Sequence, residues 1–364
     1  MSAATEALSA QGVAIWLDDL SRARLDTGTL AAMMTDQQVV GVTTNPSIFQ
    51  AAITGADDYD EDIASLAADG ADAERIIRRL TVDDVRRACE LFTEVWETTG
   101  GQDGRVSIEV DPRLAHDTDA TTAQAAELWA EVERNNLLIK IPGTQAGLPA
   151  IRATIAAGIS VNVTLLFSVN RYRQVMDAYQ SGLEDRLAAG QPIDQIHSVA
   201  SFFVSRVDTA IDPLLAELGS EQAISLQGRA AVANARLAYA AFLEQAETDR
   251  WQALEEAGAN PQRPLWASTG VKNPHYPPTL YVTELVAPGT VNTMPEATLT
   301  AVRQADPVTG DTITPNLDRA RDTLAALSEV GIDLGQVTAQ LEAEGVAKFE
   351  QAWTELLKTI DTTR

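Results

Sequence analysis

The stretch NNLLIKIPGT, residues 135–144, places one lysine inside an otherwise apolar run. The run is short enough to be a buried strand, and Lys140 has apolar neighbours on both sides. Burying a charged amine is costly unless the amine is paired, reaches water or loses its proton. The stretch therefore predicts either an edge strand whose lysine points to solvent, or an interior strand that needs an uncharged amine.

Seven further runs of this kind occur along the chain, and Ala-, Glu- and Arg-rich segments with helical spacing, such as 81–97 and 121–135, separate several of them. Such alternation predicts βαβ units and a parallel sheet. Eight strands favour a closed (β/α)8 TIM barrel over an open sheet, and the chain has no GxGxxG or GxxxxGK[ST] loop. The eight predicted strands are VAIWLDD (13–19), VVGVTTNP (39–46), RVSIEVDP (105–112), LLIKIPG (137–143), ISVNVTLLF (159–167), SVASFFVSR (198–206), PLWASTG (264–270) and TLYVTELV (279–286).

Additional helices are expected in three places. Segments 47–104 and 207–263 are too long for one helix each, and the tail from about 316 to 360 has helical spacing. Its apolar stripe, which we expect to pack on the core, consists of Phe349, Trp353, Leu356, Leu357 and Ile360. No linker interrupts the pattern, so we expect residues 1–364 to form a single barrel domain.

Composition excludes several classes of partner. The 364 residues carry a net charge of −25, which argues against nucleic acid and anionic membranes as partners. Cys89 is the only cysteine, so no intrachain disulfide can form, as in proteins of a reducing cytoplasm. Neither a secretory signal nor an apolar run of roughly 18 residues is present, so we expect a soluble cytoplasmic protein. Whether it forms a homo-oligomer stays open.

Polar residues gather on one face of five predicted strands. Strand side chains alternate between faces, and in a barrel one set points inward. Because the active end of a (β/α)8 barrel is the C-terminal rim of its strands, these polar sets should converge on one cavity. A self-satisfied structural network is the alternative interpretation. The inward polar residues are Asp18, Thr43, Asn45, Ser107, Glu109, Asp111, Lys140, Asn162 and Thr164.

Lysine is scarce in this chain. Only Lys140, Lys272, Lys348 and Lys358 are present, and the last two are expected to be solvated on the terminal helix. Arginine stays charged at physiological pH, whereas a desolvated lysine can lose its proton and act as a nucleophile. Lys140 thus suggests Schiff-base chemistry, with a nearby carboxylate taking a hydroxyl proton as a carbon–carbon bond breaks.

Five motifs of the predicted strands are VTTNPSIF (42–49), SIEVDPRL (107–114), LLIKIPGT (137–144), VNVTLLFS (161–168) and SFFVSRVD (201–208). Together they resemble the transaldolases, class I enzymes built on a (β/α)8 barrel. The resemblance runs from about residue 13 to the terminal helix, and WLDDLSR (16–22) is similar to the long actinobacterial and cyanobacterial type.

The resemblance implies a role for each position. Lys140 would form the Schiff base, Asp18 would exchange the proton of the donor's C4 hydroxyl, and Glu109 with a water held by Thr164 would shuttle protons during imine formation. The substrate-binding residues that the resemblance implies are Thr43, Asn45, Asn162, Ser201, Phe203, Arg206, Ser268 and Lys272.

Two details modify this picture. ASTGVKN (267–273) is two residues longer than the family's usual A-S-x-R-N and has Lys272 where an arginine is common, so Lys272 is either a phosphate ligand or a surface residue. Simple aldolases of the same superfamily tend to have Gln and Tyr where this chain has Glu109 and Phe203. That difference favours transfer of the three-carbon unit to a second aldehyde over release of free dihydroxyacetone.

The resemblance implies an enzyme of the non-oxidative pentose phosphate pathway. It would move a dihydroxyacetone unit from fructose 6-phosphate or sedoheptulose 7-phosphate to glyceraldehyde 3-phosphate or erythrose 4-phosphate, with sugar phosphates as its partners. No cofactor or metal is expected, since the spacing of His116, His197 and His275 suits no usual zinc pattern. The alternatives are a fructose-6-phosphate aldolase-like enzyme that releases dihydroxyacetone and a non-catalytic sugar-phosphate-binding barrel.

Overall fold

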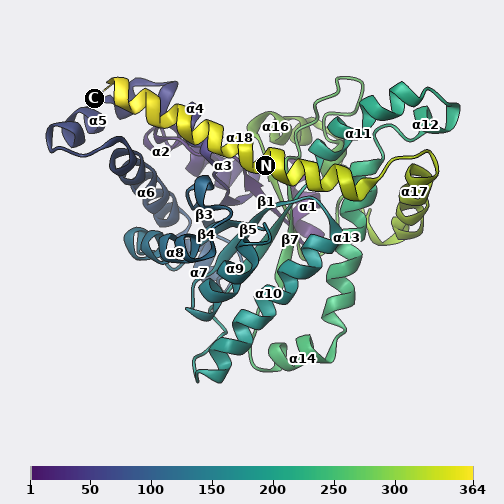
Figure 1. Ribbon diagram of the computed structural model, residues 1–364, viewed down its shortest axis with the longest axis horizontal. Coiled ribbons are helices and arrows are strands. Elements are labelled where there is room, and N and C mark those ends of the chain that lie inside the picture. Colours follow the sequence, from purple (N-terminus) through teal and green to yellow (C-terminus); the bar gives the residue numbers. More distant parts are fainter. Residues whose placement is uncertain (1, 364) are drawn as a thin grey trace.

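Eight parallel strands close into a barrel in the computed structural model, which describes residues 2–363 (Figure 1). Each strand pairs with the next in the chain, and β8 returns to pair with β1, so the sheet has no edge. The strands are β1 (Val13–Leu17), β2 (Val39–Val42), β3 (Arg105–Glu109), β4 (Leu137–Pro142), β5 (Val161–Leu166), β6 (Ser198–Phe203), β7 (Gln262–Ala267) and β8 (Thr290–Met294). The predicted (β/α)8 TIM barrel is confirmed, and β4, which carries Lys140, is an interior strand of a closed sheet.

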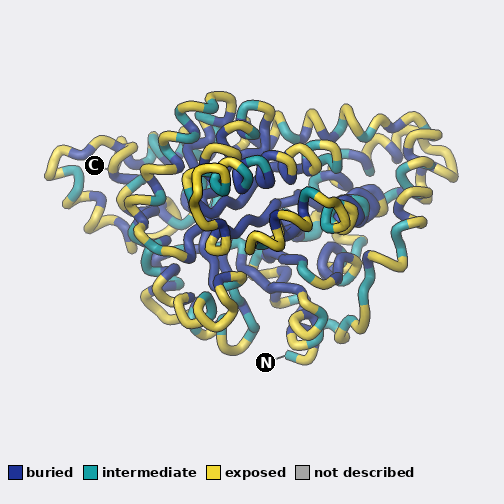
Figure 2. The backbone as a smooth tube through the Cα atoms, turned by 90° about the horizontal axis from the view of Figure 1, so that it is seen from below, coloured by how far each residue is buried: buried dark blue, intermediate teal, exposed yellow. Residues whose placement is uncertain are grey.

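Helices surround the barrel, and the buried part of the chain, dark blue in Figure 2, lies at its centre. The extra helices predicted in 47–104, 207–263 and the tail are all present. The helices are α1 (Ala3–Ala10), α2 (Arg22–Asp26), α3 (Thr29–Gln37), α4 (Pro46–Thr54), η1 (Asp57–Tyr59), α5 (Asp60–Ala68), α6 (Ala73–Leu91), α7 (Thr93–Thr98), η2 (Pro112–Leu114), α8 (Thr118–Val132), α9 (Gly147–Ala156), α10 (Val169–Ala188), α11 (Ser205–Leu218), α12 (Glu221–Ser225), α13 (Ala230–Ala246), α14 (Asp249–Glu256), α15 (Leu280–Thr283), α16 (Glu296–Gln304), η3 (Thr314–Asn316), α17 (Leu317–Glu329) and α18 (Leu334–Thr363).

The eighth strand was predicted in the wrong place. TLYVTELV (279–286) contains the short helix α15, and the strand that closes the barrel is β8, Thr290–Met294. Tyr281 is buried and donates a hydrogen bond from its hydroxyl to Asp208, while its carbonyl accepts one from Asn292 of β8. These contacts hold residues 279–286, which are rich in β-branched side chains, against the barrel with α15 as a short helix. Tertiary packing thus overrides the strand propensity of this segment.

Register aligns the polar residues of neighbouring strands. Glu109 lies opposite Lys140 in the β3–β4 pair, and Lys140 lies opposite Asn162 in the β4–β5 pair. Trp16, on the same face of β1 as Asp18, fills the interior deeper in the barrel. A Cβ atom on Gly41 of β2 would lie 2.5 Å from the Trp16 ring, so only glycine leaves room for it. The barrel is therefore packed deeper inside and polar toward its C-terminal rim.

Helix α18 crosses that rim. It is the long yellow helix in Figure 1, and it packs against α4, α6, α11 and η2. The helix thus spans the mouth of the barrel from the α11 side to the α4 side. Within residues 2–363, no helix combines the length and apolar character that crossing a membrane requires.

Candidate active site

Lys140 lies inside the barrel and is 3% exposed. Its ammonium nitrogen donates a hydrogen bond to the carbonyl of Thr44 at 2.9 Å and lies 3.1 Å from Oε2 of Glu109. The ring of Phe349, from α18, covers the same nitrogen at 5.7 Å from the ring centroid. The prediction that this lysine points inward is confirmed, and the solvent-facing alternative is wrong.

The Glu109 carboxylate is buried, and its one ion pair among residues 2–363 is with Lys140. Burial raises the pKa of the Glu109 carboxyl, and the charge of Lys140 opposes that rise. Apart from this ion pair, neither of its oxygens has a hydrogen-bond partner among residues 2–363, and the same is true of the buried Thr164 hydroxyl on β5. Buried polar atoms without a hydrogen-bond partner are unusual in structural networks. They are typical of sites that transfer protons or bind a water molecule.

Asp18 follows β1 at the rim, where Thr43 donates a hydrogen bond to its Oδ1 at 2.7 Å. Burial raises the pKa of the Asp18 carboxyl, and the charge of Lys140 and the Thr43 hydrogen bond oppose that rise. The Thr43 hydroxyl also lies 2.7 Å from the hydroxyl of Thr293, so it fixes the orientation of the carboxylate. The neighbouring Asp19 forms an ion pair with Arg24 at 2.6 Å. Asp18, and not Asp19, is therefore free to act on a ligand beside Lys140.

Amide and hydroxyl groups continue the polar surface. Ser201 donates to Oδ1 of Asn162 at 2.7 Å, and Nδ2 of Asn162 donates to Ser107 at 3.0 Å. Asn45 caps α4, because its Oδ1 accepts the Ile48 amide at 3.0 Å. Only the Nδ2 group of Asn45 thus remains available to a ligand. The fully buried Asn162 is therefore held in one orientation, and it in turn fixes the hydroxyl of Ser201.

An inner cavity of about 120 Å³ brings nine of the twelve predicted site residues together, whereas Glu109, Asn162 and Thr164 do not line it. Arg206, the second residue of α11, stacks over the Phe203 ring at 5.0 Å, and burial lowers the pKa of its guanidinium. Ser268 follows β7 with a φ of +54°, a strained conformation for a non-glycine residue that is common at functional sites. The predicted site residues that line this cavity are Asp18, Thr43, Asn45, Lys140, Ser201, Phe203, Arg206, Ser268 and Lys272.

An outer cavity of about 670 Å³ adjoins the inner one, because Arg206, Ser268 and Lys272 line both. Lys272 was predicted to be either a phosphate ligand or a surface residue. Its side chain is exposed, but it lines both cavities together with Arg206, a position from which it could bind a phosphate. A third cavity, of about 350 Å³, reaches Asn45 and Glu109 from the side of Trp353.

Sequence reasoning missed the part of the site that α18 supplies. The stripe through Phe349 was expected to pack on the core, and Leu356 and Ile360 do so, but Phe349 also lines the inner cavity and Trp353 lines the third. Lys348 is exposed as expected, yet it lines the outer cavity. An apolar stripe is the same signal whether the helix covers a core or a pocket.

Comparison with known proteins agrees with this geometry. The family model described as Transaldolase/Fructose-6-phosphate aldolase matches residues 15–360. A transaldolase of Mycolicibacterium smegmatis is 61% identical over 351 residues, which cover 96% of this chain and 95% of that protein. A transaldolase of Mycobacterium tuberculosis is 60% identical over 353 residues, which cover 97% of this chain and 95% of that protein. The chain belongs to the transaldolase/fructose-6-phosphate aldolase family.

Proposed function

We propose that this protein is a transaldolase, a transferase that moves a dihydroxyacetone unit from a ketose phosphate to an aldose phosphate through a Schiff base on Lys140. The observation that carries the proposal is the buried Lys140–Glu109 pair, 3.1 Å apart, whose lysine lines the same inner cavity as Asp18. Fructose 6-phosphate and sedoheptulose 7-phosphate are the expected donors, and glyceraldehyde 3-phosphate and erythrose 4-phosphate the expected acceptors. Such exchanges belong to the non-oxidative pentose phosphate pathway of the cytoplasm, where we place the protein.

The first step forms the imine. Glu109 accepts a proton from the Lys140 ammonium, and the free amine attacks C2 of the ketose. The resulting carbinolamine loses its hydroxyl as water when Glu109 returns a proton, which leaves a protonated imine. The Thr164 hydroxyl has no other partner among residues 2–363, so it is available to hold that water.

Carbon–carbon cleavage follows. Asp18 takes the proton of the C4 hydroxyl, the C3–C4 bond breaks, and its electron pair moves toward the imine to give an enamine. The C4 oxygen becomes the carbonyl of the departing aldose phosphate. A second aldose phosphate then accepts the enamine carbon, and Asp18 returns its proton to the new hydroxyl.

Binding follows from the remaining side chains. Asn45 and Ser201 line the inner cavity and bind the hydroxyls of the retained three-carbon unit, and Asn162 supports Ser201 from behind. Arg206, Ser268 and Lys272 lie where the inner cavity meets the outer one, so they receive the phosphate. Phe203 supplies no hydroxyl to the inner cavity, and Glu109 replaces the glutamine of simple aldolases, so we favour transfer over release of dihydroxyacetone.

A borohydride trap tests the proposal. The protein is incubated with fructose 6-phosphate and borohydride, and the intact mass and peptide map are measured. We expect a dihydroxyacetone-derived adduct on Lys140 that is absent in Lys140→Met and present in Lys358→Met, a surface lysine of α18. If no adduct forms, the alternative that the protein only binds sugar phosphates would be favoured. Rapid release of free dihydroxyacetone without an acceptor aldehyde would instead indicate an aldolase.

A further inference from the structure

The outer cavity has one wall that belongs to α18. Arg206 and Thr209 of α11 form one side, and Ser268 and Lys272 after β7 form another. The third wall consists of Val337, Gln340, Leu341, Glu344 and Lys348, all from the terminal helix. Since this cavity shares Arg206, Ser268 and Lys272 with the cavity around Lys140, it is the outer half of the same site.

Lys348 occupies a defined position on that wall. It precedes Phe349, whose ring covers the Lys140 nitrogen, so the helix places Phe349 over the reacting amine and Lys348 on the wall of the outer cavity. The backbone beneath is tightly packed. A Cβ atom on Gly345 would lie 2.9 Å from Leu165 and 3.5 Å from the Arg206 guanidinium. Helix α18 therefore approaches the site closely enough for Lys348 to act there.

Three cations share the outer cavity without ion pairs. Among residues 2–363, none of Arg206, Lys272 and Lys348 forms a salt bridge, although most arginines of this strongly acidic chain do. Glu344, four residues before Lys348, is the one acidic side chain on the cavity wall in the described part of the chain. The wall thus carries three positive charges against one negative charge.

The cations repel one another. The pKa of Lys348 is lowered, first by the charge of Arg206, then by burial and by Lys272. Such mutual repulsion costs free energy that a bound dianion removes, and a phosphate monoester carries about −1.5 to −2 charges near neutral pH. Lysine contributes a point charge and not the bidentate fork of arginine. A site with Lys272 in place of an arginine therefore gains from a second lysine.

We propose that Lys348 of α18 is a phosphate-binding residue of the substrate site and holds the phosphate of donor and acceptor together with Arg206 and Lys272. The proposal rests on the proposed function and deepens it: the terminal helix then recognises the phosphate as well as covering Lys140. Selection of phosphorylated over unphosphorylated sugars depends on this contact.

Kinetics of Lys348→Met test the proposal against Lys358→Met, a matched exposed lysine of the same helix that lines none of these cavities. We expect KM for fructose 6-phosphate to rise about tenfold in Lys348→Met, which corresponds to about 1.4 kcal/mol, with most of the effect in KM and not kcat. KM for unphosphorylated fructose should not move, Lys348→Arg should restore most of the affinity, and Lys358→Met should match the unchanged protein.

Calorimetry with inorganic phosphate separates this proposal from the proposed function, because it needs no turnover. We expect Lys348→Met to bind inorganic phosphate several-fold more weakly than the unchanged protein, and Lys358→Met to bind it equally well. Equal phosphate affinity in Lys348→Met, or an equal KM for fructose 6-phosphate, would overturn the proposal. A protein that binds phosphate through Lys348 but transfers no dihydroxyacetone would contradict only the proposed function.

Discussion

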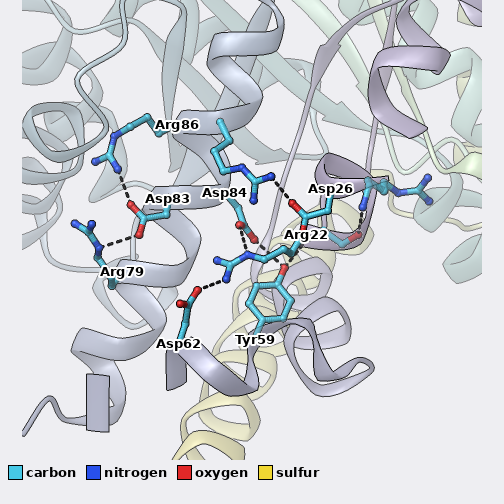
Figure 3. A network of polar contacts seen from close by, with 11 residues as sticks. Arg22, Asp26, Tyr59, Asp62, Arg79, Asp83, Asp84 and Arg86 are labelled. Carbon is cyan, nitrogen blue, oxygen red and sulfur yellow. Dashed lines mark hydrogen bonds and ion pairs between the residues drawn. The ribbon is translucent and has the colours of Figure 1, made fainter. Parts of the chain in front are cut away.

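Two clusters of buried charge differ in how completely they are satisfied. Figure 3 shows the first, where the fully buried Asp84 of α6 accepts hydrogen bonds from Arg22 Nε at 3.0 Å and from the Tyr59 hydroxyl at 2.8 Å. Arg22 also pairs with Asp62 and lies over the Tyr59 ring at 4.6 Å. Both Asp84 oxygens thus have partners, and the residue lines none of the cavities at the barrel mouth.

The second cluster is the one around Lys140. The side chain of Glu109 is nearly as buried as that of Asp84, but Lys140 is its only partner among residues 2–363, and Asp18 faces the inner cavity. Burial raises the pKa of Asp84 just as it raises the pKa values of Asp18 and Glu109. A raised pKa therefore does not separate a catalytic carboxylate from a structural one. The two kinds of carboxylate differ instead in how many of their oxygens have hydrogen-bond partners and in whether they line a cavity.

The largest expected effect tests the catalytic side of this contrast. Asp18→Ala should still form a borohydride-trapped adduct on Lys140, now with the mass of intact fructose 6-phosphate, but lose carbon–carbon cleavage by about 10²–10⁴-fold, the usual effect of removing a positioned acid/base. Single-turnover release of aldose phosphate measures the loss. Asp19→Ala is the matched control, since Asp19 is held by Arg24. Full activity in Asp18→Ala would mean that the wrong carboxylate has been assigned.

Substitution of the structural carboxylate Asp84 should instead lower stability and leave the chemistry at Lys140 intact. Asp84→Asn leaves the buried Arg22 guanidinium without its main counter-ion, so we expect a loss of about 3–5 kcal/mol in the free energy of unfolding. The adduct on Lys140 should still form in the folded protein. Urea denaturation measures the loss.

Asp83→Asn is the control for that experiment. Asp83 lies beside Asp84 on α6 but makes only partly exposed ion pairs with Arg79 and Arg86, which are also visible in Figure 3. We expect it to change stability by at most about 1 kcal/mol. Equal losses in the two variants would remove the distinction between a satisfied buried cluster and a solvated one.

Sequence periodicity predicted the Lys140 cluster because strand alternation is local. Once the barrel closes, period two alone brings Lys140, Glu109 and Asp18 to one rim. The Arg22–Asp84 cluster was not predicted, since Arg22 and Asp84 lie 62 positions apart on separate helices and no periodicity links them. The eighth strand was misplaced for a related reason, because Tyr281 is held by contacts with Asp208 and β8 and not by its neighbours in the chain.

The smallest expected effect concerns stability against pH. The pKa of Asp18 is raised in the folded protein, so the folded state is favoured while this carboxyl is protonated, and that contribution is lost as pH rises from about 4 through the raised value. Asp18→Asn keeps an acceptor for the Thr43 hydroxyl but removes the buried charge. We therefore expect Asp18→Asn to be more stable than the unchanged protein at pH 7 by about 0.5–2 kcal/mol, and the gain to vanish below pH 4. Urea titrations at several pH values measure it. Asp84→Asn carries the same chemical change with the opposite expected sign at pH 7, because it takes a counter-ion from Arg22. If Asp18→Asn were also destabilised at pH 7, the Asp18 carboxylate would belong to a satisfied network, and its readiness to accept a proton would need another cause.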